Sequence, residues 1–161
     1  MDQGQIDAAL RRAIDRGGEA GARLLAIDWA KTPLGPIDRW SSGLQVTLSL
    51  VLGHGLAMSL GWGPELIQIY NDASIPYLGG KHPNAMGKRL SEIENGTWNA
   101  LKSTLAQVVW AGRPVTVRAR PMMVEREGRA EKRLVDVTYS AVRDESGDVA
   151  GVLATLIEPV G

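Results

Sequence analysis

The sequence predicts an α+β fold with two strands first, helices in the middle and three strands at the end. The ranges 55–61, 65–70, 114–124, 132–142 and 149–157 fit strands, and side chains alternate with the period of a strand in the first and the fourth of them. Residues 97–111 instead carry apolar side chains three and four positions apart, the spacing of one helix face. Separate runs of strands and helices are typical of α+β domains. We therefore expect five antiparallel strands, with the long helix between the second and the third.

Length and composition narrow the possible classes of protein. The 161 residues suffice for one domain with a real core. The 18 basic and 18 acidic residues cancel, so no basic surplus predicts a nucleic-acid partner. The chain has no cysteine, which excludes disulfides, thiol catalysis, thiolate metal sites and thiol-linked chromophores. This composition fits a reducing cytoplasm.

One stretch has the length of a membrane span. Residues 40–64 form a run of 25 positions without Asp, Glu, Lys or Arg. Five glycines and several polar residues dilute it, and its period changes from helical to alternating near Gly53. We interpret it as a buried helix followed by a buried strand. The N-terminus has no apolar region of the signal-peptide kind, so we expect a cytoplasmic protein.

The first 35 residues form a predicted helical extension and lead-in, followed by the main domain at 36–161. Residues 3–16 fit an amphipathic helix that stops at Gly17, and residues 19–27 fit a second short helix. The apolar face of the first helix packs either on its own domain or on a second copy. Because a helix this short is marginal alone and two-fold dimers are common, we expect a homodimer through this face. The interface candidates are Ile6, Leu10, Ala13 and Ile14.

The first half of the main domain carries clear start and stop signals. Pro36 suits the first turn of a helix whose apolar face runs to Val51, against the sheet or a second subunit. The residues at 61–64 predict a tight turn between the first two strands. Asn71 follows the second strand and fits the N-cap of a short helix that ends before Gly79.

The second half of the main domain carries similar signals for a long helix and three strands. Thr97 fits the N-cap of the long helix, whose apolar face carries Trp98, Leu101, Leu105 and Val108. Turn-forming residues at 125–129 and 144–148 separate the last three strands.

Several short motifs, in order and at plausible spacing, resemble a PAS sensory domain of the kind found at the N-terminus of bacterial sensor histidine kinases. They run from about Ala26 to the C-terminus and include Trp62-Gly63-Pro64, the Tyr-Asn-Asp-Ala block at 70–73 and Gly-x-Lys-His-Pro at 79–83. The resemblance implies a five-stranded antiparallel sheet with helices on one face, here preceded by N-terminal helices. The chain departs from the family pattern in having no Phe.

Residue types argue against catalysis and against the best-known PAS cofactors. The only histidines are His54 and His82, and no metal-binding or catalytic spacing surrounds them, so we expect no enzyme and no metal site. Cysteine-dependent flavin photochemistry and a covalently attached chromophore are excluded by the absence of cysteine. The long helix at 97–111 lacks the histidine that haem-binding PAS domains use, which argues against haem. The cofactor, if there is one, stays unknown.

A PAS-like fold places a ligand cavity between the sheet and the long helix. Each candidate for its lining lies on that helix, on a strand or next to the capped short helix. The alternative role of each is structural, either packing in the core or capping a helix. The candidates are Met58, Tyr70, Asn71, Tyr77, Trp98, Leu101, Val117, Tyr139 and Val152, with Met86, Met122 and Met123 expected to close the space.

The resemblance implies a sensory and interaction module of bacterial two-component signal transduction, acting through helix packing at a dimer or at a histidine kinase or other signalling partner. It leaves open whether the chain is the first domain of a kinase or a single-domain regulator. A ligand-free adaptor of the same fold is the alternative function, and a small α+β enzyme is a third.

Overall fold

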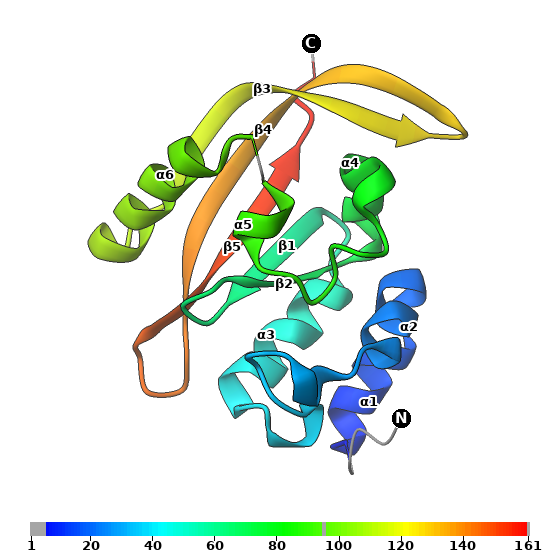
Figure 1. The fold of residues 1–161 in the computed structure, drawn as a ribbon, viewed down its shortest axis with the longest axis vertical. Helices are drawn as coiled ribbons and strands as arrows, with labels where there is room; N and C mark the ends of the chain where they lie inside the picture. The colour runs from blue at the N-terminus through cyan, green and yellow to red at the C-terminus, as the bar shows by residue number, and fades with distance from the viewer. Residues whose placement is uncertain (1–5, 95, 161) are drawn as a thin grey trace.

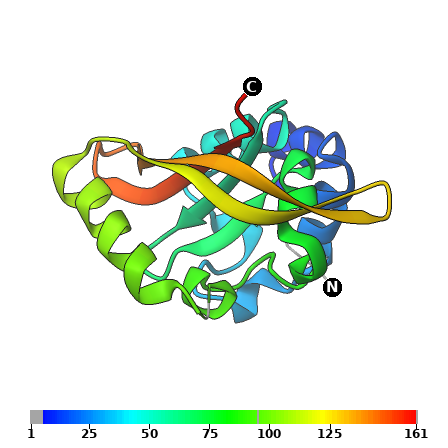
Figure 2. The ribbon, with the colours of Figure 1, turned by 90° about the horizontal axis from the view of Figure 1, so that it is seen from above.

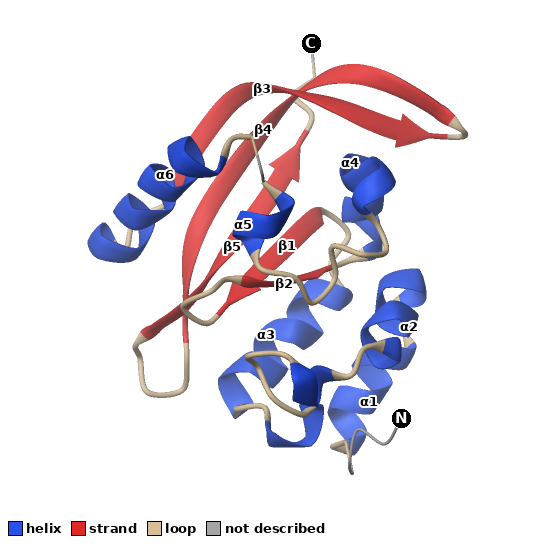
Figure 3. Ribbon diagram, viewed as in Figure 1, coloured by secondary structure: helices blue, strands red, loops and turns tan. Residues whose placement is uncertain are grey.

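The computed structural model describes residues 6–94 and 96–160. Its strands form a single five-stranded antiparallel sheet in the order β2-β1-β5-β4-β3 (Figure 3). The strands are β1 (Ala57–Trp62), β2 (Ile67–Tyr70), β3 (Val115–Arg126), β4 (Arg129–Arg143) and β5 (Val149–Ile157). Each of the five overlaps its predicted range, with β1, β3 and β4 extending beyond it, and the predicted α+β class with an antiparallel sheet is confirmed.

The β3–β4 hairpin is longer than the sequence predicts. Its turn shrinks from the predicted 125–129 to Glu127 and Gly128, which have φ angles of 53° and 75°. Positive φ at both central residues is the signature of a tight two-residue hairpin turn, and such a turn lets the flanking strands pair to their ends. Figures 1 and 2 show that the hairpin reaches over α4 (Ile75–Leu78).

Six α-helices lie in the described ranges, joined by short 3₁₀ turns. Besides α4 they are α1 (Ala8–Asp15), α2 (Gly18–Ala26), α3 (Ser42–Leu52), α5 (Leu90–Ile93) and α6 (Trp98–Ala111). The predicted helix after Pro36 is divided: Ile37–Arg39 forms a 3₁₀ turn and α3 starts after Ser41. The Ser41 side chain accepts a hydrogen bond from the Leu44 N–H, so Ser41 acts as the N-cap.

The sheet is covered on both faces. On one face, α4, α5 and α6 lie over the sheet, as the resemblance implied. The N-terminal helices α1, α2 and α3 lie on the other face (Figures 1 and 2). The alternate side chains of β1, namely Met58, Leu60 and Trp62, share a core with these helices. The N-terminal helices therefore form a third layer.

The expectation that α1 presents its apolar face to a second copy is wrong. Leu10 is 2 % exposed and Ile14 1 % exposed, because both lie in the core that α1 shares with α3 and β1. Ile6 packs against the same core, and Ala13 is half-buried. The backbones of α1 and α2 meet at Gly21, where an added Cβ would lie 2.1 Å from the Ile14 carbonyl oxygen. These residues hold the helix on its own domain.

Residues on both sides of the predicted boundary at 35/36 share that core. Asp72, at the start of the segment before α4, also holds the first turn of α2: its carboxylate accepts hydrogen bonds from the Glu19 N–H at 3.2 Å and the Ala20 N–H at 2.7 Å. The division at residue 35 remains a prediction. Within residues 6–94 and 96–160, no helix combines the length and the apolar run that crossing a bilayer requires.

Candidate functional site

A cavity of about 120 Å³ lies between the sheet and the layer formed by α4, α5 and α6. Residues of all three helices and all five strands contribute to its wall. Most of the wall is apolar, and its apolar residues include Leu66, Leu90, Leu101, Leu105, Met122, Val137, Val152 and Leu156. The polar side chains that reach it are Ser59, Gln68, Tyr70, Ser74, Tyr77, Lys81, Glu94, Arg120 and Tyr139. A mostly apolar space with a few polar groups is typical of a small-molecule site.

The cavity exists because the central strands carry small side chains on this face. Ser59 and Gly61 of β1 and Ala154 of β5 form its floor, whereas the bulky residues of β1 point to the N-terminal helices. A Cβ added at Gly61 would lie 2.8 Å from the Gln68 Nε2 atom. The Gln68 amide in turn donates to the Leu66 carbonyl at 2.9 Å, which fixes its orientation.

One end of the cavity is closed by a polar cluster of Glu94, Arg120 and Tyr139. The Arg120 guanidinium lies 3.2 Å from the Glu94 carboxylate and donates to the Tyr139 hydroxyl at 3.1 Å. Arg120 reaches this place because a β-bulge between Val117 and Arg120, with Ala119 at φ 54°, shifts the register of β3. Burial raises the pKa of the Tyr139 hydroxyl.

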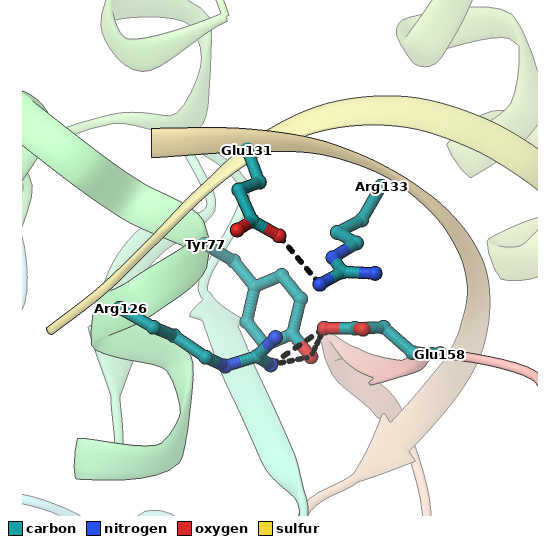
Figure 4. Close-up of polar contacts among 5 residues, drawn as sticks. All are labelled: Tyr77, Arg126, Glu131, Arg133 and Glu158. Atoms are coloured by element: carbon teal, nitrogen blue, oxygen red, sulfur yellow. Dashed lines mark hydrogen bonds and ion pairs between the residues drawn. The ribbon is translucent and has the colours of Figure 1, made fainter. Parts of the chain in front are cut away.

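The other end is closed by a second polar cluster, in which Tyr77 of α4 meets the end of the β3–β4 hairpin and the segment after β5 (Figure 4). The Tyr77 hydroxyl donates to the Glu158 carboxylate at 2.8 Å. Arg126 pairs with the same carboxylate, and its guanidinium carbon lies 5.5 Å from the centroid of the Tyr77 ring. The hydrogen bonds from Arg126 and Tyr77 lower the pKa of Glu158. The cluster joins the cavity wall to the C-terminal end of the sheet.

Tyr70 connects the cavity to the N-terminal layer. Its hydroxyl lies 2.7 Å from the His82 Nδ1 atom, and the His82 Nε2 atom lies 3.4 Å from the Glu19 carboxylate on α2. Burial raises the pKa of Tyr70 to about 12. The hydroxyl therefore stays protonated across the physiological range.

Five of the predicted candidates line the cavity: Tyr70, Tyr77, Leu101, Tyr139 and Val152. The other four do not. Met58 lies on the opposite face of the sheet, and Asn71 caps the 3₁₀ turn after β2. Trp98 lines a separate groove. Val117 packs against the hydrophobic cluster that contains Leu101 and Leu105, but it does not line the cavity.

Of the three methionines expected to close the space, Met122 lines it and Met123 is 57 % exposed. Met86 is buried in the core that the N-terminal helices share with β1. The sequence prediction missed Ser59, Gln68, Glu94 and Arg120. The small and polar residues between the apolar positions of β1 were the available signal for the first of these.

Asn71 has a structural role that its position after β2 explains. Its Oδ1 atom accepts from the Met58 N–H at 3.1 Å and from the Ser74 N–H at 3.2 Å. Its Nδ2 group donates to the carbonyls of Val51 at 2.9 Å and Leu56 at 2.8 Å. This buried amide ties α3, β1 and the capped turn together. The predicted cap at Thr97 is different: its hydroxyl donates to Glu94 at 2.8 Å, and α6 starts without a side-chain cap.

The residues present do not fit a flavin or a haem. The cavity of about 120 Å³ is well below the 300–1,000 Å³ typical of sites for larger ligands. The chain has no cysteine for flavin photochemistry, and neither His54 nor His82 lines the cavity. Across the described ranges, no three His, Asp or Glu side chains gather closely enough to hold a metal ion.

Comparisons with known proteins agree with the geometry at the level of the fold. No protein-family model matches the chain, and no curated protein matches it. Among solved structures, the PAS domain of BvgS from Bordetella pertussis is 18% identical, with a TM-score of 0.51, over 73% of this chain and 87% of that one. A sensory box sensor histidine kinase from Vibrio cholerae is 11% identical, with a TM-score of 0.52, over 74% of this chain and 94% of that one.

A C-terminal domain from Streptococcus mutans is 24% identical, with a TM-score of 0.51, over 71% of this chain and 83% of that one. The strand order, the helices over one face and these structural matches lead to the same conclusion: the chain has the fold of PAS sensory domains.

Proposed function

We propose that this chain is a sensory module of bacterial signal transduction that binds a small organic molecule between its sheet and α4–α6. The cavity of about 120 Å³ carries this proposal. An engineered cavity of about 150 Å³ in another protein binds benzene, so the present one suits a ligand of about five or six non-hydrogen atoms. Its role is recognition rather than catalysis, and its place is the cytoplasm.

The wall chemistry points to a ligand with an apolar body and one hydrogen-bonding end. The apolar side chains of α6 and β5 suit the body, and Ser59 and Gln68 on the floor suit the polar end. Lys81 and Arg120 bring two positive charges to the wall, and Glu94 brings one negative charge. A neutral or singly anionic molecule is therefore favoured over a cation.

The polar clusters at the ends of the cavity suggest how binding is transmitted. A ligand that displaces Tyr77 acts on Glu158 through their hydrogen bond, and so on the chain that leaves the sheet after β5. A ligand that displaces Tyr70 acts through His82 on α2. Both ends of the domain are thus coupled to the cavity, as a module that signals to a histidine kinase or another partner requires.

Two measurements test ligand binding. Native mass spectrometry of the purified protein should reveal a retained small molecule. Thermal unfolding with 1-butanol, butyrate and butylamine as probes should show stabilisation by the alcohol or the acid and none by the amine. At 100 times its dissociation constant, a ligand adds about 2.7 kcal/mol, or a Tm shift of about 5–10 °C at this chain length.

A matched pair of variants locates the effect. Ala154→Leu fills the floor of the cavity and should abolish the shift, whereas Ala130→Leu makes the same change on an exposed part of the hairpin and should preserve it. Equal shifts in both variants would place the ligand elsewhere. No retained molecule and no shift with any probe would favour the ligand-free adaptor of the same fold.

A further inference from the structure

The outer side of α6 carries an apolar surface that is separate from the proposed ligand site except at Leu66, Leu105 and Val152, which line both. A groove of about 600 Å³ runs between α6 and the turns that join β1 to β2 and β4 to β5. Trp62, Pro64 and Val149 form one wall, and Trp98 and Ala106 form the other. Figures 1 and 2 show α6 at the edge of the molecule, with no described element outside it.

A large aromatic side chain stands at the rim of this groove. Trp110 is 89 % exposed, and the neighbouring Val109 is 43 % exposed. Trp is enriched in the buried centres of protein interfaces and depleted from free surfaces, because its ring removes about 200 Å² from water when it is covered. An exposed indole beside an apolar groove is therefore the mark of an interaction surface.

We infer that this surface, defined by the groove and Trp110, binds a second copy of the chain about a two-fold axis. A two-fold interface needs a patch that is complementary to itself. Here one patch holds both a protruding indole and a groove lined by two further tryptophans. The Trp110 ring of each copy enters the groove of the other, so that one contact is made twice.

The spacing of residues along α6 supports this arrangement. Lys102 and Trp110 lie four positions before and after Ala106, and all three line the groove. When two α6 helices pack antiparallel with the axis at Ala106, Lys102 of each copy faces Trp110 of the other. The small Ala106 side chain lets the helices approach, and the lysine stem and ammonium group both interact favourably with an indole face.

The charges of the patch are self-complementary as well. Lys102 stands on the α6 wall and Asp144 on the wall formed by the β4–β5 turn, and neither forms an ion pair within the described residues. When two such grooves meet about a two-fold axis, each lysine comes near the opposite carboxylate. The formal net charge of the chain is zero, so two copies do not repel one another overall.

Sedimentation velocity of the full chain between 1 and 200 μM tests the inference. We expect a concentration-dependent dimer. Trp110→Glu should weaken it at least 30-fold, the loss typical of a central aromatic residue. Val46→Glu changes a side chain that is 71 % exposed on α3, on the other layer, and should leave the dimer unchanged.

A charge pair distinguishes this contact from general hydrophobic association. Lys102→Glu should weaken the dimer, and adding Asp144→Asn should restore part of the affinity, since the asparagine removes the repulsion and keeps the acceptor oxygen that holds the turn. A monomeric wild type at 200 μM would overturn the inference, as would a Trp110→Glu variant that dimerises normally. Ligand binding by the monomeric variants should persist, so either proposal can fail without the other.

Discussion

Removing the side chain of Asn71 should destabilise the domain far more than removing an exposed asparagine. In Asn71→Ala, three backbone groups lose a hydrogen bond from the amide: the Met58 N–H, the Leu56 carbonyl and, through a longer bond of 3.3 Å, the His54 carbonyl. The Ser74 N–H keeps a bond to the Asn71 carbonyl, and the Val51 carbonyl keeps one from the His54 N–H. The cost therefore comes chiefly from the Met58 N–H and the Leu56 carbonyl, whose bonds to the amide are shorter.

Burial sets the size of each contribution. A buried polar group left without a partner costs about 1–3 kcal/mol. Met58 is 7 % exposed, which places its N–H at about 2 kcal/mol, whereas Leu56 is 46 % exposed, so water reaches its carbonyl and the cost is about 1 kcal/mol. We expect Asn71→Ala to lose about 3 kcal/mol in total, a large share of the stability of an ordinary domain.

Urea unfolding followed by circular dichroism measures this difference directly, and the midpoint of thermal unfolding should fall by about 6–12 °C. Asn84→Ala, at an exposed position, is the control and should stay within about 0.5 kcal/mol of the wild type. A loss of less than 1 kcal/mol in Asn71→Ala would refute the reasoning. It would mean that water replaces the amide without cost.

Three further perturbations have defined outcomes. Burial raises the pKa of Tyr70 to about 12 from 10.0, so the unfolded chain releases this proton first as pH rises. The free energy of unfolding should therefore fall between pH 10 and 12, and it should fall less in Tyr70→Phe. Urea titrations at several pH values would show the difference. Because Arg126 lowers the pKa of Glu158 from 4.5, stability should fall as pH drops below about 4.5, and Glu158→Gln should flatten that decline. Gly21→Ala should cost about 1–3 kcal/mol in urea unfolding, because α2 must move away from the Ile14 carbonyl, whereas Gly55→Ala meets open space and should cost little.

Each outcome has a clear contradiction. Equal alkaline slopes for wild type and Tyr70→Phe would show that other tyrosines control the transition. An unchanged acid limb in Glu158→Gln would mean that the cluster with Arg126 adds nothing to folding. A Gly21→Ala variant as stable as the wild type would show that α1 is not held tightly on its own domain.

The strands and the long helix follow from the sequence because their periods are local properties. Which face of a strand borders the cavity does not follow from its sequence period. In β1 the apolar set contains Met58, and the alternate set contains Ser59 and Gly61, so the larger side chains suggested the lining. In a sheet covered on both sides, however, the bulky set fills the tighter core and the small set leaves the space.

Two other errors have similar physical causes. The stripe on α6 divides between two spaces: Leu101 turns into the cavity, whereas Trp98 lies on the groove side. A bulge after Val117 brings Arg120 to the cavity, and a one-residue register change of this kind leaves no periodic trace in the sequence. An amphipathic face, as on α1, shows that a helix will be covered but not by which chain.

The two edge strands of the sheet bear on how the protein behaves at high concentration. The outer edge of β3 contains Pro121, which has no N–H to donate, and the bulge with its left-handed Ala119. The other edge, β2, is only four residues long, and its Gln68 already exchanges backbone hydrogen bonds with Gly87 and Lys88. Neither described edge is a flat template for strand addition, which protects the protein from edge-to-edge polymerisation. Any rise in mass with concentration should therefore come from contacts other than strand addition.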